Sequence, residues 1–179
     1  MLLKVGGAVL ALLIVGVVAV LVAAATKPDK FRVQRTVDVN AHADKIFPLI
    51  NDFRSFGSWS PYEARDPEMK RSYSGATSGK GAVYAWDGNK DVGAGRMEIL
   101  DSTPPSRIAI KLDFTRPFEA HNVVEFTLVP HGGSTMVTWA MEGPSPFVAR
   151  IVQVFFDMDR MVGGDFETGL GRLKLLAEK

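Results

Sequence analysis

The spacing of hydrophobic side chains divides this chain into three parts. Residues 5–25 carry no charged or polar side chain. The odd-numbered positions from Phe31 to Val39, all apolar except Arg35, then alternate with polar neighbours, which is the two-residue period of a half-buried strand. Near the end of the chain, large apolar residues recur every three or four positions, as on one face of a helix. The pattern predicts an apolar N-terminal segment, a strand-rich middle and a C-terminal amphipathic helix.

The middle of the chain reads as one short helix followed by a series of strands. Residues 40–50 place Ile46, Phe47 and Ile50 on one helical face, and Phe53 follows in the next turn. From Met69 onward, strand-like segments alternate with turns rich in Gly, Pro and Asn. These segments are residues 69–74, 81–86, 92–102, 106–115, 118–129 and 134–142. Their close spacing predicts an antiparallel meander.

The C-terminal helix is the element best suited to cover the apolar face of this sheet. Its apolar positions are Met158, Val162, Phe166, Leu170, Leu173 and Leu176 or Ala177. They span about five helical turns, which no other predicted element of the soluble part matches. An antiparallel sheet with one apolar face needs such a cover, so the predicted fold class is α+β.

The apolar segment at residues 5–25 has two interpretations. About 20 apolar residues suffice for a helix to cross a bilayer, which predicts a single-pass anchor at residues 1–26 and a soluble domain at 27–179. A cleaved signal peptide is the alternative, because Ala23 and Ala25 form a small-residue cleavage pattern; signal cores are usually shorter, about 7–15 residues. The basic cluster after the segment, formed by Lys27, Lys30, Arg32 and Arg35, favours a cytoplasmic domain.

Charge and composition exclude some partners. Of 21 basic residues, Lys4 belongs to the N-terminal segment, so the rest of the chain balances 20 basic against 20 acidic side chains. A nucleic-acid-binding domain is expected to carry a basic stripe or net positive charge, so nucleic acid is not an expected partner. The histidines at 42, 121 and 131 have no metal-ligand spacing and the chain has no cysteine, so neither a metal nor another cofactor is expected.

Several strings resemble the helix-grip superfamily, called SRPBCC or START-like, and within it the polyketide cyclase/dehydrase and lipid-transport group. They are FRVQRTVDVNAHADKIFPLINDFRSFGSWSPY, GKGAVYAWDGN, GAGRMEILDSTPPSRIAIKLDF, VEFTLVPHGGSTMVTWAMEG and DFETGLGRLKLLAE. The resemblance covers nearly all of residues 31–178. It implies a curved seven-stranded antiparallel sheet wrapped around the C-terminal helix, with a cavity for an apolar molecule between them. The N-terminal membrane span is a departure from the minimal family domain.

Aromatic residues are the candidate ligand contacts. Phe53, Phe56, Trp59 and Tyr62 recur every third position; the first two are expected in the core, and the last two in a loop at the cavity mouth. The helix-grip order would bring aromatics from separate segments around one cavity. The predicted ligand-binding residues are Trp59, Tyr62, Trp86, Phe114, Trp139, Met161 and Phe166. The glycines at 163, 164, 169 and 171 predict either close approach of the helix to the sheet or a flexible helix.

Catalytic residues are harder to assign. Alternation along HNVVEFTLVP places Val124, Phe126 and Leu128 on one face and Glu125 on the other, so Glu125 is expected to face solvent. Asp165 and Glu167 flank Phe166 and point sideways or outward if Phe166 is inside. No catalytic residue is therefore predicted.

The expected function is binding of a hydrophobic or amphipathic, lipid-like small molecule by a membrane-anchored, non-enzymatic domain. A cyclase or dehydratase acting on a polyketide-like substrate is the alternative from the enzyme class. A protein-interaction module on the same fold is the third possibility. The sequence predicts neither the ligand nor the oligomeric state.

Overall fold

The computed structural model describes the backbone of residues 2–179 and the side chains of residues 12–179. It forms two compact units. The sheet unit contains residues 32–143 and 159–179, and the α1–α3 unit contains the residues up to Phe31 together with Pro144–Met158. The segment Pro144–Met158 thus joins the N-terminal part, whereas the sequence-based division at residue 27 groups it with the soluble domain.

The sheet is seven-stranded and antiparallel, with the order β1-β7-β6-β5-β4-β3-β2. Its strands are β1 (Lys30–Val39), β2 (Lys70–Gly75), β3 (Ala82–Asp87), β4 (Ala94–Thr103), β5 (Arg107–Arg116), β6 (Ala120–His131) and β7 (Ser134–Pro144). Strands β2 to β7 follow one another as a meander, and β1 joins the edge at β7. Each strand lies within about two residues of its predicted position, because the alternation and the intervening turns both mark it.

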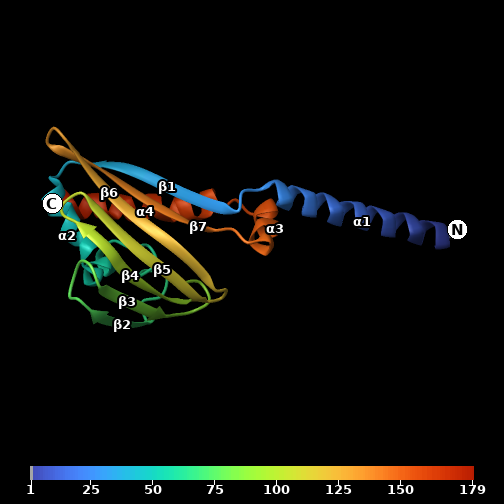
Figure 1. The fold of residues 1–179 in the computed structure, drawn as a ribbon, viewed down its shortest axis with the longest axis horizontal. Helices are drawn as coiled ribbons and strands as arrows, with labels where there is room; N and C mark the ends of the chain where they lie inside the picture. Colours follow the sequence, from blue (N-terminus) through green and yellow to red (C-terminus); the bar gives the residue numbers. More distant parts are fainter. Residues whose placement is uncertain (1) are drawn as a thin grey trace. The chain divides into compact units, whose positions relative to one another are not determined.

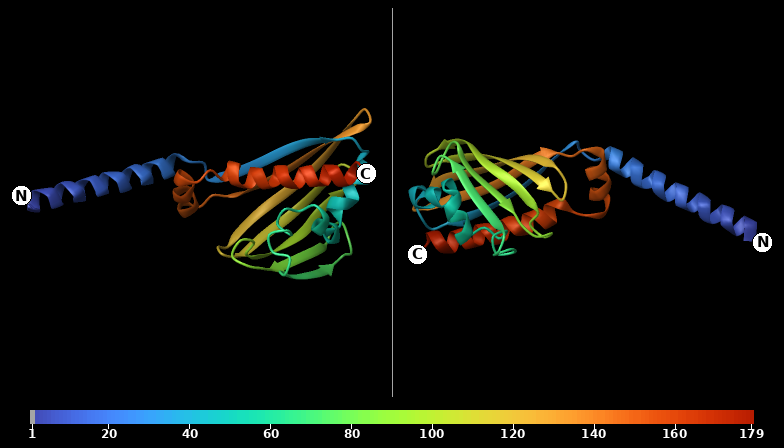
Figure 2. Two further views of the ribbon diagram at one scale, coloured as in Figure 1. Left: turned by 180° about the vertical axis from the view of Figure 1, so that it is seen from behind. Right: turned by 90° about the horizontal axis from the view of Figure 1, so that it is seen from below.

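The long helix α4 (Met158–Ala177) lies along the inner face of the curved sheet (Figures 1 and 2). Its apolar face is buried, as the three- and four-residue spacing predicts. The buried side chains are Phe166, Leu170, Leu173 and Ala177. Two of the four predicted close approaches are confirmed: a Cβ at Gly163 would overlap the Arg35 guanidinium, and a Cβ at Gly169 would lie 2.8 Å from the Trp139 ring. A Cβ at Gly164 or Gly171 would meet nothing within 4 Å.

Two short helices follow β1 and bury the first aromatic residues. Helix α2 (Ala43–Asn51) buries Ile46, Phe47 and Ile50. The 3₁₀ helix η1 (Phe53–Ser58) is capped at its N-terminus by Asp52, whose side chain accepts a hydrogen bond from the Arg54 amide. A 3₁₀ helix has three residues per turn, so residues three apart share a face. The three-residue aromatic spacing is therefore the period of η1, and Phe53 and Phe56 are core residues as predicted.

The α1–α3 unit contains helix α1 (Leu2–Thr26) and a second helix, α3 (Phe147–Phe155), which the sequence reasoning does not predict. The two helices are in contact. The first part of the segment at residues 5–25 lies outside the described side chains. Among the described residues, no helix is both long and apolar enough to cross a membrane.

Candidate functional site

The centre of the sheet's inner face is occupied by an aromatic cluster, Trp59, Phe126, Trp139 and Phe166. The Trp139 and Phe166 rings stack with centroids 4.0 Å apart, and Trp59 meets Trp139 edge-on at 5.5 Å. The Trp59 indole donates a hydrogen bond to the Leu49 carbonyl oxygen at 2.9 Å, and its side chain is 0 % exposed. The expectation that Trp59 lies at a cavity mouth is wrong, because the 3₁₀ turn carries it inward behind Phe56.

One polar atom in this cluster has no partner. The indole Nε1 of Trp139 is buried and makes no hydrogen bond among the described residues. A buried donor without a partner costs about 1–3 kcal/mol. The same ring packs against Gly169 and lies near Pro61, which comes from the loop after η1. The cluster therefore joins the loop, the sheet and α4, and contains one unused donor.

A second aromatic group lies toward the β2 edge of the inner face, where Trp86 and Phe114 are half-buried and Tyr84 is buried. The rings of Trp86 and Phe114 are perpendicular with centroids 5.6 Å apart, and Tyr84 stacks on Trp86 at 5.9 Å. Trp86 donates from Nε1 to the Val92 carbonyl oxygen at 3.1 Å. Its ring lies across Gly95, where a Cβ would come within 2.6 Å of the indole. Trp86 is thus fixed in place while part of it stays accessible.

Tyr62 and Met161, the remaining two predicted contacts, lie apart from both groups. Tyr62 is half-buried, with the Arg65 guanidinium 5.3 Å above its ring. Burial raises the pKa of Tyr62, and the neighbouring Asp165 carboxylate on α4 raises it further. Arg65 is ion-paired with Asp165. Met161 is 58 % exposed, so nothing in the sheet unit encloses it.

The sequence reasoning missed a shielded carboxylate, Glu63, in the loop after η1. Its Oε1 accepts a hydrogen bond from the Tyr84 hydroxyl at 2.5 Å, and its Oε2 accepts one from Arg71 Nε at 2.7 Å. Only 11 % of the Glu63 side chain is exposed. Burial raises the pKa of Tyr84, and the bond to Glu63 adds to this effect. The charged residues in YEARDP, which begins with the last of the regularly spaced aromatics, Tyr62, were the sequence feature that could have indicated this carboxylate.

The carboxylates of the inner face are engaged by neighbouring donors. Both oxygens of Glu63 accept hydrogen bonds, and Asp165 is paired with Arg65. A general base must present a free oxygen within hydrogen-bond reach of the substrate proton. Glu125 lies on the outer face, as predicted, and pairs with Arg107. The arrangement suits an aromatic binding wall better than an acid–base site.

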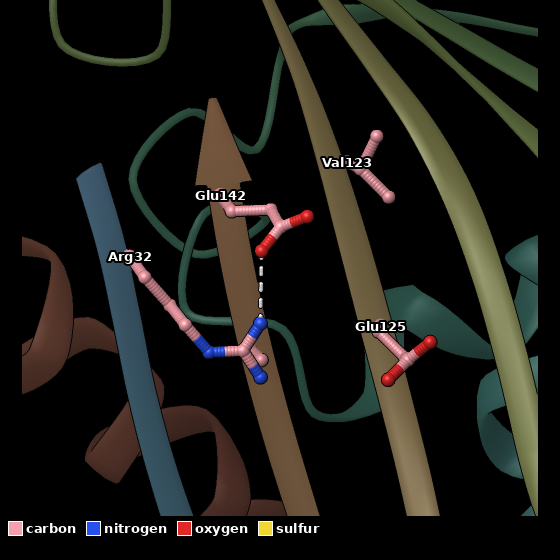
Figure 3. A pocket seen from close by; sticks show the side chains of 5 residues that line it. Arg32, Val123, Glu125 and Glu142 are labelled. Atoms are coloured by element: carbon pink, nitrogen blue, oxygen red, sulfur yellow. Dashed lines mark hydrogen bonds and ion pairs between the residues drawn. The ribbon is translucent and has the colours of Figure 1, made fainter. Parts of the chain in front are cut away.

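The outer face carries a shallow groove between β1, β6 and β7 (Figure 3). Its volume is about 70 Å³, well below the roughly 300–1,000 Å³ of typical small-molecule sites. It is lined by Arg32, Val123, Glu125, Ala140 and Glu142. Arg32 reaches across β7 to Glu142 at 2.9 Å, while Glu125 stands on the next strand (Figure 3). Within the described chain, no three histidine or carboxylate side chains group as metal ligands.

Comparison with known proteins gives one family match over most of the chain. A family model described as "Polyketide cyclase / dehydrase and lipid transport" matches residues 30–178. No curated protein matches significantly.

Solved structures share the fold at low sequence identity. Protein CV1439 from Chromobacterium violaceum has a TM-score of 0.58 at 15 % identity, over 85 % of this chain and 99 % of that one. Major latex-like protein 151 from Panax ginseng has a TM-score of 0.60 at 11 % identity, over 85 % of this chain and 100 % of that one. The Aha1 dimer from Colwellia psychrerythraea has a TM-score of 0.60 at 12 % identity, over 83 % of this chain and 96 % of that one. The helix-grip resemblance is confirmed.

Proposed function

We propose, from the premise that this chain belongs to the polyketide cyclase/dehydrase and lipid transport family, that its sheet unit binds a hydrophobic or amphipathic small molecule without transforming it. The observation that carries the proposal is the half-buried aromatic group on the inner face. Trp86 and Phe114 form a fixed apolar wall there, whereas Trp59, Trp139 and Phe166 are core residues. The lipid transport in the family's description is consistent with such a ligand.

The wall formed by Trp86 and Phe114 is large enough to matter for affinity. A tryptophan side chain can bury roughly 150–250 Å². Covering half of that with an apolar ligand stabilises the complex by about 2–3 kcal/mol, at about 25 cal/mol per Å² before association costs. The hydrogen bond to Val92 and the close contact with Gly95 hold Trp86 in place. Little side-chain entropy is then lost on binding.

The membrane anchor is part of the same proposal. Residues 5–25 lack charged and polar side chains, and all large apolar side chains between Leu12 and Val22 except the half-buried Val20 are exposed to solvent in the isolated chain. Such a helix needs an apolar environment around it. We propose that it is retained and holds the sheet unit on the cytoplasmic side of the membrane. Cell fractionation and intact-mass measurement test this, since a soluble mature protein starting near Thr26 would show a cleaved signal peptide instead.

An enzyme of the cyclase or dehydratase type is the second candidate. The observation that favours it is the pair of neutral phenols Tyr84, on β3, and Tyr62, in the loop after η1. Raised pKa values keep Tyr62 and Tyr84 protonated, so either hydroxyl could donate to a substrate carbonyl. Against it, the Tyr84 hydroxyl already donates to Glu63. Turnover of a poly-β-keto compound that is abolished in Tyr84→Phe would establish this alternative.

The deciding experiment identifies the bound molecule. The full chain is purified in detergent, and small molecules released from it are measured by mass spectrometry, alongside titration with the fluorescent fatty acid cis-parinarate. Trp86→Ala should lose the copurified molecule and weaken cis-parinarate binding about tenfold or more, which corresponds to about 1.4 kcal/mol.

Phe118→Ala is the matched aromatic control, because Phe118 is highly exposed and makes none of the ring contacts of the half-buried group. It should bind like the wild type. Equal binding by wild type and Trp86→Ala would place the ligand elsewhere. Failure of the wild type to bind or retain any molecule would favour the protein-interaction module.

A further inference from the structure

Helix α3 contacts α1 and still presents an open apolar face. The side chains of Phe147, Val148, Ile151, Val152 and Phe155 fall in one arc of about 140°, given 100° per helical residue. None of the helix residues is buried, and Val148 and Phe155 are 73 % and 65 % exposed. Exposed apolar patches of this kind mark a surface with a partner.

The polar face of α3 is used to attach the helix. Arg150 donates from Nη1 to the Lys27 carbonyl oxygen at 3.3 Å, and Gln153 donates to the Ser145 hydroxyl at 2.9 Å. The Ser145 amide in turn donates to the Asp29 carbonyl oxygen at 2.7 Å. These bonds tie α3 to the segment that follows α1. Arg150 Nη1 and the Gln153 amide are therefore bonded within the unit, whereas the buried Nε of Arg150 has no hydrogen-bond partner among the described residues. The apolar arc is the side left for a partner.

The surroundings of α3 indicate which partner fits. Helix α1 contacts α3 and exposes large apolar side chains over the part that is described, so the same unit carries exposed apolar side chains on both helices. Lys27, Lys30 and Arg150 outnumber the carboxylates Asp29 and Asp157 in this unit. Apolar surface combined with an excess of basic side chains is typical of a helix at an anionic lipid surface.

We infer that α3 is an interfacial helix whose apolar arc lies in the headgroup region of an anionic bilayer, beside the anchor proposed above. The inference rests on that anchor but assigns a separate contact. Interfacial helices sink their apolar face about 5–10 Å into the boundary between headgroups and acyl chains. Phe155 and Val148 would be placed at that depth, whereas Gln153 would face away from the lipid.

The chain contains no cysteine, so single labels can be placed along α3 of the full-length protein. Val148→Cys, Phe155→Cys and the control Gln153→Cys each receive the environment-sensitive fluorophore NBD. The labelled chains are reconstituted into vesicles of phosphatidylcholine with phosphatidylglycerol, and spin-labelled lipids serve as quenchers. Flotation of the vesicles reports on the anchor, and circular dichroism shows that each variant is folded.

The expected result is flotation of all three variants, with blue-shifted emission and several-fold stronger quenching at positions 148 and 155 than at 153. Flotation with equal signals at the three positions overturns the role of α3 and leaves the anchor intact. Absence of flotation overturns both. A blue shift at 148 and 155 without vesicles shows that a protein surface covers the arc, which also overturns the inference. Ligand binding by the sheet unit is measured separately and does not affect these outcomes.

Discussion

The two faces of the sheet are formed by the same strands but differ in how far their side chains are buried. On β6, Val124, Phe126 and Leu128 point inward and are buried, while Glu125 between them points outward and pairs with Arg107. The inner face also contains charged groups, but Glu63 there is shielded and its carboxylate oxygens are both hydrogen-bonded. The exposure of charges on the outer face varies, and the ion pair of Arg32 with Glu142 is about half exposed. A polar change should therefore be costly on the inner side and mild on the outer side.

The largest difference is expected on α4, where one helix has a buried and an exposed leucine. Leu170→Asp would bury a carboxylate without a partner, because Leu170 is 1 % exposed. That costs several kcal/mol, comparable to the whole stability of a domain, about 5–15 kcal/mol. Leu175→Asp is the matched control, since Leu175 is 68 % exposed. Thermal unfolding should show a collapsed sheet unit only for Leu170→Asp; equal losses would mean that the buried face of α4 is wrongly assigned.

The next largest effect tests the aromatic cluster at the centre of the inner face. Trp59→Ala should destabilise the domain by about 3–5 kcal/mol, because it leaves a cavity and breaks the hydrogen bond to Leu49. Trp86→Ala should cost less than half as much, since Trp86 is only half-buried. Urea unfolding of both variants measures the difference. If Trp86→Ala were the more damaging change, the half-buried group would be core and not a binding wall.

The contrast between the faces also explains what the sequence can predict. Alternation and turn residues located each strand, and three- and four-residue spacing located α4, because both periods are fixed by backbone geometry. The depth of Trp59 was not predictable in this way: its position depends on η1 being a 3₁₀ helix, in which a three-residue spacing defines one face. Glu63 was missed because its partners, Arg71 and Tyr84, meet it only in the folded structure.

The α1–α3 unit illustrates a different limit. Helix α3 spans nine residues between Pro146 and Phe156, and only Ser145 and Pro146 separate it from the end of strand β7 at Pro144. Short apolar runs do not distinguish strand from helix by periodicity. The position of α3 beside α1 depends on backbone and side-chain hydrogen bonds to the segment around Lys27 and Asp29. The apolar residues at 147, 148, 151, 152 and 155 do follow a helical spacing, which the sequence reasoning overlooked. The position of α3 beside α1 leaves no such pattern in the sequence.

A smaller difference in stability is expected between substitutions of one carboxylate on each face. Glu63→Gln removes the charge that faces Arg71, and we expect a loss of about 1–3 kcal/mol, because the partly buried arginine loses its paired carboxylate and keeps only neutral oxygen acceptors such as the Pro67 and Met69 carbonyls. Glu142→Gln breaks the exposed pair with Arg32 (Figure 3) and should change stability by less than about 0.5 kcal/mol. Chemical denaturation checks both values. Similar losses would contradict the distinction between shielded and exposed pairs.

The smallest effect concerns a pH-dependent pair on the outer face, His121 and Asp113. The hydrogen bond to Asp113, 2.7 Å from His121 Nδ1, raises the pKa of His121. Burial of Asp113 would raise its own pKa, but the bonds from Lys111 and His121 outweigh this and lower it. NMR titration should give a His121 midpoint above 6.5 in the wild type, and Asp113→Asn should return it toward the ordinary value of about 6.5.

The pair should stabilise the fold only within a limited pH range. Because the pKa of His121 is raised by folding, its contribution is complete below about pH 6.5 and is lost as the pH rises through the folded-state value. Because the pKa of Asp113 is lowered, its contribution is present above about pH 3.9 and is lost as the pH falls through the folded-state value. His121→Ala should therefore lower the melting temperature slightly near pH 5 and leave it unchanged near pH 9. An equal loss at both pH values would mean that His121 contributes by packing and not by charge.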